Sequence, residues 1–387
     1  SFPVEKRGAA MGIFGLVIIM APVIGPTLSG YLVEHFSWHY LFIVILPFAV
    51  ISLLLGIFKF DNVMETRPVT VDVLSIILST IGFGGLLYGF STASSAGWNA
   101  FEVWGTITIG TIALIIFVLR QLRLEKPLLS MEVYKHPMYA MGSVISVVIS
   151  MAMFSGMILT PLYVQNVRGI SPLDAGLMML PGALVMGLMS PITGKIFDRI
   201  GPRPLAVVGL SIVAISTYFL SQLKLDTTYT YLIIAYTVRM LGMSMVMMPI
   251  MTNGLNQLPQ RLNPHGTALN NTLQQVAGAI GSAVMITIMT NRTKSEADDL
   301  DIKATVAKKV KEKAMEAAQN GEQMTEVQMA KYGKEVAKHL ANKAMVEGIN
   351  FSFFIAMIIT IVALVLSLFL KRVKVTPAQV EEDKTAK

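Results

Sequence analysis

Long apolar runs separated by short polar segments dominate the pattern of this chain. Ten runs reach the length of about 20 mostly apolar residues that an α-helix needs to cross a bilayer. Lipid offers the backbone no hydrogen-bond partner, so continuous runs predict helices rather than the short alternating strands of a membrane barrel. The predicted spans are residues 8–32, 39–59, 72–94, 103–121, 139–163, 172–194, 203–222, 229–252, 266–290 and 349–371.

The composition agrees with an all-α integral membrane protein. Of the 387 residues, 53% are hydrophobic and 14% are charged, whereas about 25% of a soluble domain is charged. The chain has no cysteine, and its five histidines do not cluster, so we expect no metal site. It also lacks a GxxxxGK[ST] phosphate loop and any Ser/His/Asp or Cys/His constellation, so we expect neither an ATPase nor another enzyme.

Lysine and arginine are distributed unevenly between the two sets of span ends. One set holds fifteen of them, whereas the opposite short loops hold only Arg168 and Lys224. The positive-inside rule places the basic set, and with it both ends of the chain, in the cytoplasm. The tryptophans Trp38, Trp98 and Trp104 all fall at the outer ends, where the interface suits them. We attribute the net charge of +7 to these loops and expect no nucleic-acid partner.

The polar segment 291–348 separates the last two spans and is predicted to lie outside. It is rich in Lys, Glu, Ala and Gln, which favours a soluble, largely helical excursion, for instance over residues 303–319. A solvated insertion without a site is the favoured interpretation. A surface that binds an outside partner is the alternative.

One cation lies deep within a predicted span. Arg239 is the only Lys or Arg in such a position, and no Asp or Glu is comparably deep. Because a buried cation is costly unless it meets water or a partner, Arg239 is a candidate for the substrate or ion pathway. A structural tie to backbone carbonyls is the alternative.

Amides gather in the ninth span, which carries 270-NNTLQQ-275. Two of them, Asn270 and Gln274, share one helix face, and Asn271 and Gln275 share another. Amides in a membrane helix hold helices together or line a wet cavity, and four within two turns favour the cavity. Gln165, near the outer end of the fifth span, is a further candidate, with a purely interfacial position as the alternative.

The first span, 12-GIFGLVIIMAPVIGPTLSG-30, combines small residues with prolines. Its stripe of Ala21, Gly25 and Ser29 permits close approach of another helix. Its two prolines, Pro22 and Pro26, bend the helix and favour a hinge, with packing alone as the alternative.

These features together resemble the major facilitator superfamily, and in particular its fourteen-helix drug:proton antiporters of the EmrB/QacA type, near the lincomycin-resistance exporters of Gram-positive bacteria. The first span resembles the antiporter helix motif GxxxxxxxxGxxxGPxxGG, and the segments 38-WHYLFIVILP-47 and 161–183 are similar to further family signatures. In the antiporter motif, Ala21 and Ser29 replace glycines, and the matching residues are Gly12, Gly25, Pro26 and Gly30.

The charged stretch 194-GKIFDRIGPRP-204 resembles the second-half copy of the family's GxxxDRxGxRP loop. The resemblance implies a cytoplasmic gate, in which charged side chains make contacts in one access state and lose them in the other. A simple topological anchor is the alternative. Arg239 resembles the second-half counterpart of the family's proton-linked arginine. The matching gate residues are Gly194, Asp198, Arg199, Gly201 and Arg203.

The resemblance also implies a division of the chain. Four helices would precede Ser1, so that ten of fourteen are present here. The expected parts are the last two helices of an N-terminal bundle (1–60), an inserted central pair (61–130), five helices of a C-terminal bundle (131–290), the extracellular insertion (291–348), the last helix (349–371) and a cytoplasmic tail (372–387).

The implied function is secondary active export of small amphipathic, drug-like compounds across a bacterial plasma membrane. Proton entry would drive it without a cofactor, and it would work by alternating access. A transporter of one defined solute is an alternative, and so is a membrane-embedded sensor or scaffold that uses residues 291–348. The absence of deep charged rings disfavours a channel. The sequence leaves the oligomeric state open.

Overall fold

The computed structural model describes residues 25, 27–59, 72–124, 127–319 and 324–373. Within these ranges every regular element is a helix, which confirms the predicted all-α class. Residues 27–35 are helical, and they are followed by α2 (Tyr40–Lys59), α3 (Val73–Ala96), α4 (Phe101–Arg123), η2 (Met131–Lys135), α5 (Pro137–Leu162), η3 (Tyr163–Val167), α6 (Pro172–Ile200), α7 (Pro202–Leu220), α8 (Tyr229–Ser244), α9 (Met247–Leu255), η4 (Gln260–Leu262), α10 (Asn263–Asp299), α11 (Ile302–Gln319) and α12 (Glu326–Ser367).

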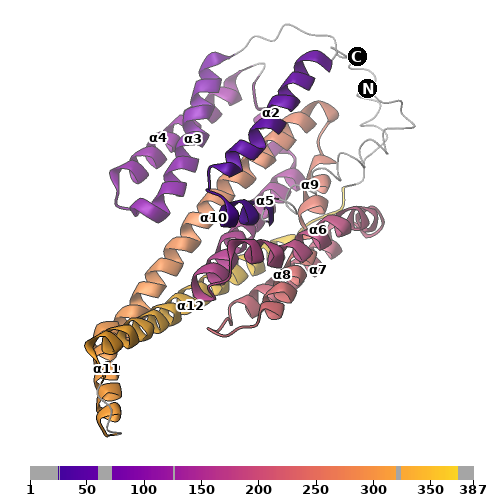
Figure 1. The fold of residues 1–387 in the computed structure, drawn as a ribbon. Coiled ribbons are helices and arrows are strands. Elements are labelled where there is room, and N and C mark those ends of the chain that lie inside the picture. Colours follow the sequence, from indigo (N-terminus) through magenta and orange to yellow (C-terminus); the bar gives the residue numbers. More distant parts are fainter. Residues whose placement is uncertain (1–24, 26, 60–71, 125–126, 320–323, 374–387) are drawn as a thin grey trace.

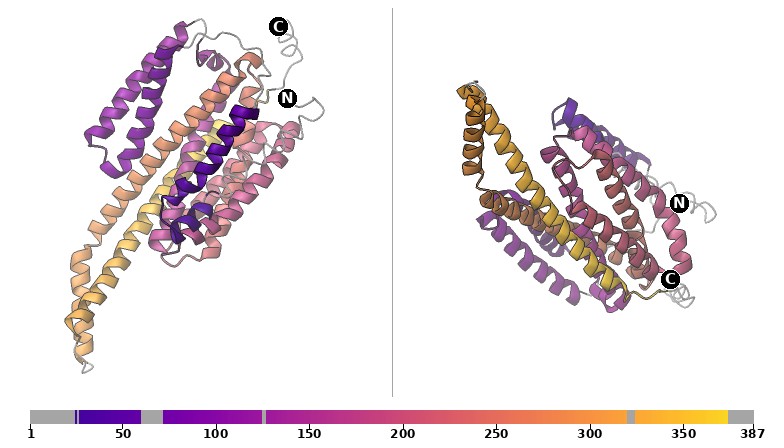
Figure 2. Two further views of the ribbon diagram at one scale, coloured as in Figure 1. Left: turned by 45° about the horizontal axis from the view of Figure 1, so that its top comes forward. Right: turned by 90° about the horizontal axis from the view of Figure 1, so that it is seen from below.

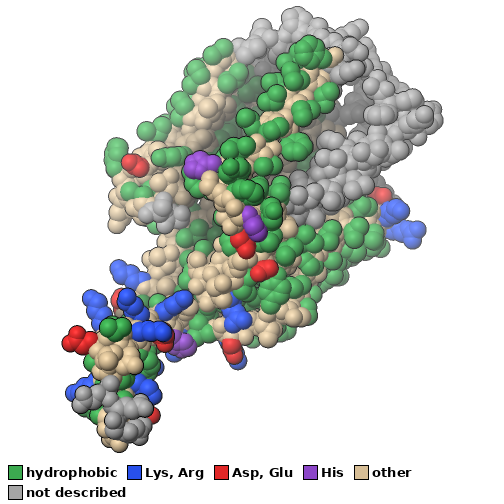
Figure 3. All heavy atoms as spheres, viewed as in Figure 1, with side chains coloured by type: hydrophobic (Ala, Val, Ile, Leu, Met, Phe, Trp, Pro, Cys, Tyr) green, Lys and Arg blue, Asp and Glu red, His purple; other side chains and the backbone are tan. Residues whose placement is uncertain are grey.

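The described residues contain nine helices that are long and apolar enough to cross a membrane, with α8 and α9 counted together. Each corresponds to one of the last nine predicted spans. Most of the first predicted span, 8–32, lies outside the described residues. Figure 3 shows hydrophobic side chains over the helix bundle and charged side chains gathered around α11. Such an apolar outer surface is suited to lipid, whereas the charged end is suited to water.

The helices from α5 to α12 form one bundle. Within it α10 packs on α5 and α12, α12 also packs on α7, and α8 packs on α6 and α7. Its largest apolar core joins side chains of α5, α6, α8, α10 and α12. The pair α3 and α4 lies side by side along α10 (Figures 1 and 2), and Trp98 between them donates a hydrogen bond of 2.7 Å to Thr287 of α10.

The predicted eighth span, 229–252, is two helices rather than one. The break lies at Met245 and Val246, between α8 and α9. Pro249 explains the position, because a proline lacks an N–H and its ring clashes with the carbonyl four residues earlier, here that of Met245.

The segment 291–348 is built mainly from continuations of two membrane helices. The 37 residues of α10 extend to Asp299, and α12 runs for 42 residues without interruption. Packed against α12, α11 completes a helical hairpin that projects from the bundle (Figure 1). The helical content expected for this segment is therefore present: α11 corresponds to the predicted helix over 303–319, and the extensions of α10 and α12 supply the other described helical turns.

Two asparagines of α12 tie the base of this hairpin to neighbouring turns. Asn350 pairs with the backbone of Leu223, accepting from its N–H at 3.0 Å and donating to its carbonyl at 2.8 Å. Asn342 donates to the carbonyl of Val167 at 3.4 Å. The hairpin is thus joined to the turns that follow α5 and α7.

Candidate functional site

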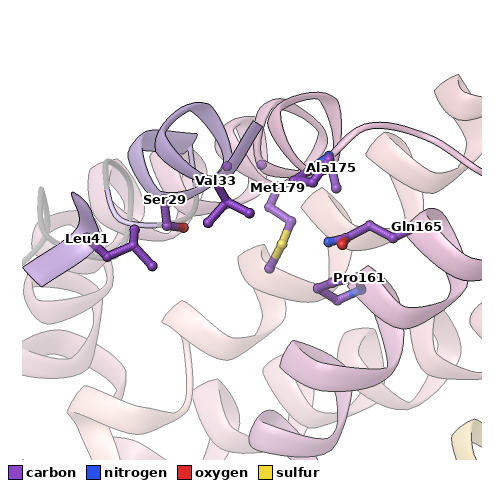
Figure 4. A pocket seen from close by; sticks show the side chains of 10 residues that line it. Ser29, Val33, Leu41, Pro161, Gln165, Ala175 and Met179 are labelled. Carbon is purple, nitrogen blue, oxygen red and sulfur yellow. The ribbon is translucent and has the colours of Figure 1, made fainter. Parts of the chain in front are cut away.

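A cavity of about 340 Å³ lies where residues 29–41 meet the end of α5 and the start of α6. Pockets that hold small molecules have volumes of roughly 300–1,000 Å³. Figure 4 shows side chains of all three segments around this space. The described residues that line it are Ser29, Gly30, Val33, Leu41, Pro161, Gln165, Pro172, Ala175, Gly176 and Met179.

Close backbone contact beside the cavity joins its two walls. A side chain at Gly30 would collide with the carbonyl of Pro172, so only glycine permits this approach. Next to it, Thr27 donates to the carbonyl of Gly176 at 3.4 Å. One turn further, Glu34 accepts from the backbone N–H of Leu173 at 3.1 Å, a suitable place for an anion at the start of α6.

The antiporter helix motif is only partly described. Gly30 occupies a crowded contact, whereas a Cβ at Gly25 would meet nothing within 4 Å. Gly12, Ala21 and Pro26 lie outside the described residues. The small-residue packing predicted for this helix is therefore observed at its final glycine.

Gln165 reaches the cavity from a π-helical turn. This turn, η3, follows Pro161, and Arg168 N–H bonds to the Tyr163 carbonyl five residues earlier at 3.2 Å. Tyr163 is fully buried and its hydroxyl donates to the carbonyl of Lys224, which anchors the inner side of the turn. Gln165 points into the space between the walls (Figure 4). Single π-helical turns inside α-helices often occur at functional sites.

Arg239 does not line this cavity. Its side chain is completely buried between α5, α7 and α8, where it donates to the Ala152 carbonyl at 2.6 Å and to the Thr217 hydroxyl at 3.3 Å. A side chain at Gly156 would overlap the guanidinium, so this glycine provides the room. Within the described chain, Nη1 of Arg239 has no hydrogen-bond partner. Arg239 is therefore tied to a backbone carbonyl, which the sequence analysis gave as the alternative to a place in the substrate or ion pathway.

The four amides of α10 do not meet at one place. Asn270 is buried beside a crevice of about 10 Å³ between α5, α9 and α10, and its Nδ2 has no partner among the described residues. Gln274 is half-buried, whereas Asn271 and Gln275 are exposed. The structure therefore does not bring these amides together with Gln165 or Arg239 in a common site.

The predicted gate loop is mostly helix. Gly194, Asp198 and Arg199 belong to the end of α6, and Gly201 alone separates α6 from α7. Gly201 has φ 83°, a left-handed conformation that favours glycine at a helix end. Expecting a loop over 194–204 was wrong because the charged residues continue the helix, and only the glycine ends it.

The charged side chains of this turn point away from the interior. Asp198, Arg199 and Arg203 are exposed, and the Asp198 carboxylate makes no ion pair or hydrogen bond with the described residues. The backbone carbonyls of Asp198 and Arg199 instead accept hydrogen bonds from Arg372, which follows α12. A cation at these carbonyls completes the C-terminal end of α6.

The model of the Major Facilitator Superfamily matches residues 1–282. This chain belongs to the Major Facilitator Superfamily. Its membership confirms the predicted membrane transporter and agrees with the prediction that the chain is not an enzyme. The nine apolar helices of the described residues fit the same family.

Three relatives illustrate what this member of the superfamily is similar to. An uncharacterised transporter of the same family, YhcA of Bacillus subtilis, is 42% identical over 96% of this chain and 71% of its own length. The lincomycin resistance protein LmrB of Listeria monocytogenes is 49% identical over 74% of this chain and 61% of its own length. The tetracenomycin C resistance and export protein of Streptomyces glaucescens is 28% identical over 76% of this chain and 54% of its own length. The chain thus spans between 54% and 71% of the lengths of these relatives.

A solved structure of the superfamily has the same fold. It is a bacterial homologue of the human lysosomal transporter Spinster, in an inward-facing and occupied conformation. The TM-score is 0.55, with 16% identity over 96% of this chain and 71% of the other. At this identity the likeness concerns the fold.

In this member of the superfamily, sequence reasoning missed the residues that fasten the end of α12. Asn253 of α9 is fully buried, donates to the Lys371 carbonyl at 3.1 Å and accepts from Val373 N–H at 3.0 Å. Together with Arg372 it holds the chain after α12 against α6 and α9. No motif marks this asparagine, and Arg372 counted only as one of several basic residues at a span end.

Proposed function

We propose that this chain belongs to a secondary active exporter of small amphipathic, drug-like compounds. The observation that carries the proposal is the cavity between residues 29–41 and the α5–α6 pair. Its lining is mainly apolar with a few polar groups, the usual chemistry of a small-molecule site. It lies between the two parts of the chain that we assign to different bundles, at the predicted outer end of α5.

The names of the relatives support drug-like substrates. Proteins named for lincomycin resistance and for tetracenomycin C resistance and export are among them. We infer that compounds of comparable size and amphipathic character are the substrates here. We further propose the fourteen-helix drug:proton antiporter type, in which 1–60 contribute to the N-terminal bundle, 61–130 form a central pair and the bundle of 131–290 and 349–371 completes the transporter.

In this proposal the residues of the transport pathway lie on more than one surface of the protein. Gln165 meets the substrate in the conformation described here. Asn271 and Gln275 are candidates for the exposed face of α10, and Asn270 and Gln274 for its inner face. The helix end with Asp198 and Arg203 is proposed as the cytoplasmic gate.

Efflux from living cells tests the proposal. Cells that express the complete gene product are loaded with lincomycin or tetracenomycin C, and accumulation is measured with and without a proton uncoupler. We expect lower accumulation than in empty-vector cells, and loss of the difference after uncoupling. Equal accumulation in both strains would refute export, and efflux that survives uncoupling would refute proton coupling.

Cysteine labelling tests the proposed plasma-membrane orientation, with both chain ends cytoplasmic. Residues 1–387 contain no cysteine, so a thiol introduced into them is the only one in this part of the protein. Asp198→Cys should react with an impermeant maleimide only after the membrane is opened, whereas the exposed Lys224→Cys should react in intact cells. The reverse pattern would invert the orientation.

A further inference from the structure

The polar side chains around the cavity differ in whether they already form hydrogen bonds within the protein. Glu34, at its edge, already accepts from the Leu173 N–H. Arg168, at the end of the π-helical turn, donates to the Leu225 carbonyl at 2.8 Å. Gln165, by contrast, is exposed to the cavity, and its amide forms no hydrogen bond with the described residues. Its carbonyl and amino groups are therefore available to a ligand.

The lining carries no charged side chain among its described residues. A charged ligand that leaves water for such a site would lose hydration, and the carboxylate of Glu34 at the cavity edge already accepts from the Leu173 N–H, so the transfer is costly. A neutral ligand loses less, and the apolar wall of Val33, Leu41 and Met179 would cover its hydrophobic part. Methionine adapts to different shapes, so this wall does not impose one outline.

The structure of the turn sets the position of the amide. Tyr163 is buried, and its hydroxyl donates a hydrogen bond to the carbonyl of Lys224. This contact fixes the inner side of the turn between Tyr163 and Val167. The wider π-helical turn then presents Gln165 at the opposite side, toward residues 29–33 (Figure 4). A side chain aimed by a fixed turn can discriminate between ligands by hydrogen bonding.

We infer that Gln165 is a specificity-determining residue of this cavity, which selects uncharged amphipathic molecules that carry a hydrogen-bond donor. The inference rests on the proposed function in that it names the substrate chemistry of the same site. The ligand would donate to the Gln165 carbonyl oxygen while its apolar part lies against Met179 and Leu41. Methylation of the donor would remove that interaction and leave the apolar contacts.

Binding measured on the purified full-length protein in nanodiscs tests the inference without relying on transport. The two neutral probes are N-phenyl-1-naphthylamine, which has one N–H donor, and its N-methyl derivative, which has none. Fluorescence titrations are corrected with empty nanodiscs. For the wild-type protein we expect the N–H probe to bind about five to ten times more tightly, the worth of one hydrogen bond.

The variant Gln165→Leu should remove this preference and leave binding of the N-methyl probe unchanged. Asn166→Leu is the matched control, because Asn166 is exposed on the same turn but does not line the cavity. It should keep the wild-type preference. If Gln165→Leu keeps the preference, or weakens both probes equally, the inference is wrong.

Ethidium, a permanent cation, tests the selection against charge. We expect it to bind the wild-type protein at least about tenfold more weakly than the N–H probe, because the described lining holds no charged side chain and Glu34 at its edge is already hydrogen-bonded. Equal or tighter binding of ethidium would overturn this part of the inference. If these binding results hold but cells show no efflux, the export proposal fails while the assignment of Gln165 stands.

Discussion

Gln165 and Arg239 are both polar residues within predicted spans, and their surroundings are opposite. Arg239 is sealed among α5, α7 and α8, and a backbone carbonyl is its nearest partner. Gln165 lies open to the cavity on a π-helical turn. The comparison teaches that the cost of a polar group in the membrane is a poor guide to its role. A charge can be buried by packing, whereas a neutral amide can remain open to a ligand.

The largest effect should come from filling the space that Arg239 occupies. In Gly156→Val the new side chain would overlap the guanidinium of Arg239, which is completely buried. We expect the free energy of unfolding to fall by at least about 3 kcal/mol, the upper range for overpacking. Size-exclusion profiles and thermal melts in detergent would measure this. The control Gly84→Val, at an open position on α3, should remain folded, and equal losses in both would contradict the sealed interior.

Removal of the arginine should have the next largest effect. Arg239→Ala leaves the acceptors at Ala152 and Thr217 without their donor and opens a gap between α5 and α8. We expect stability to fall by about 2–3 kcal/mol, while the protein that remains folded keeps its preference for the N–H probe. If Arg239→Ala kept its stability but lost the preference for the N–H probe, Arg239 and not Gln165 would be the residue that binds the ligand.

The contact beside the cavity can be tested with two glycines of one helix. Gly30→Val would force the helix away from Pro172, whereas Gly25→Val meets nothing within 4 Å. A clash of about 1–3 kcal/mol at this contact corresponds to a decrease in efflux of about fivefold to 150-fold for Gly30→Val. Thermal melts should change little, since the contact lies outside the core of the bundle. Similar efflux by both variants would show that the close approach is dispensable.

The smallest effect is expected at the predicted cytoplasmic end. Arg372→Ala removes two hydrogen bonds to the last carbonyls of α6, and we expect stability to fall by about 1 kcal/mol because both partners become accessible to water. Arg199→Ala, an exposed neighbour whose side chain makes no such bonds, is the control. If the two variants had indistinguishable melting temperatures, the contacts of Arg372 would not stabilise the α6–α7 turn.

The helices were predictable because hydropathy and length are averaged over many residues. The predicted span 39–59, for example, corresponds to α2 (Tyr40–Lys59). Local irregularities depend on single bonds. The break before α9 has a visible cause in Pro249, but the π-helical turn after Pro161 and the one-residue link at Gly201 required coordinates.

The candidate site was less predictable, because helix periodicity shows which residues share a face but not what covers that face. Asn270 and Asn271 are adjacent, yet one is buried and the other is exposed. Arg239 was identified as unusual, but its partner Ala152 offers only a backbone carbonyl, which leaves no signal in a sequence. Gln165 was the weaker candidate because nothing in its neighbours indicated a cavity.

The uninterrupted course of α12 has a mechanical consequence. Residues 326–348 of this helix extend beyond the last predicted span, which at 1.5 Å per residue amounts to about 34 Å. A stiff rod of that length amplifies rotation: a tilt of about 10° within the bilayer would move the far end by about 6 Å. Pairs of spin labels near the tip of the hairpin and on α4 would therefore register a change of inclination that is too small to detect between the membrane-embedded helices themselves.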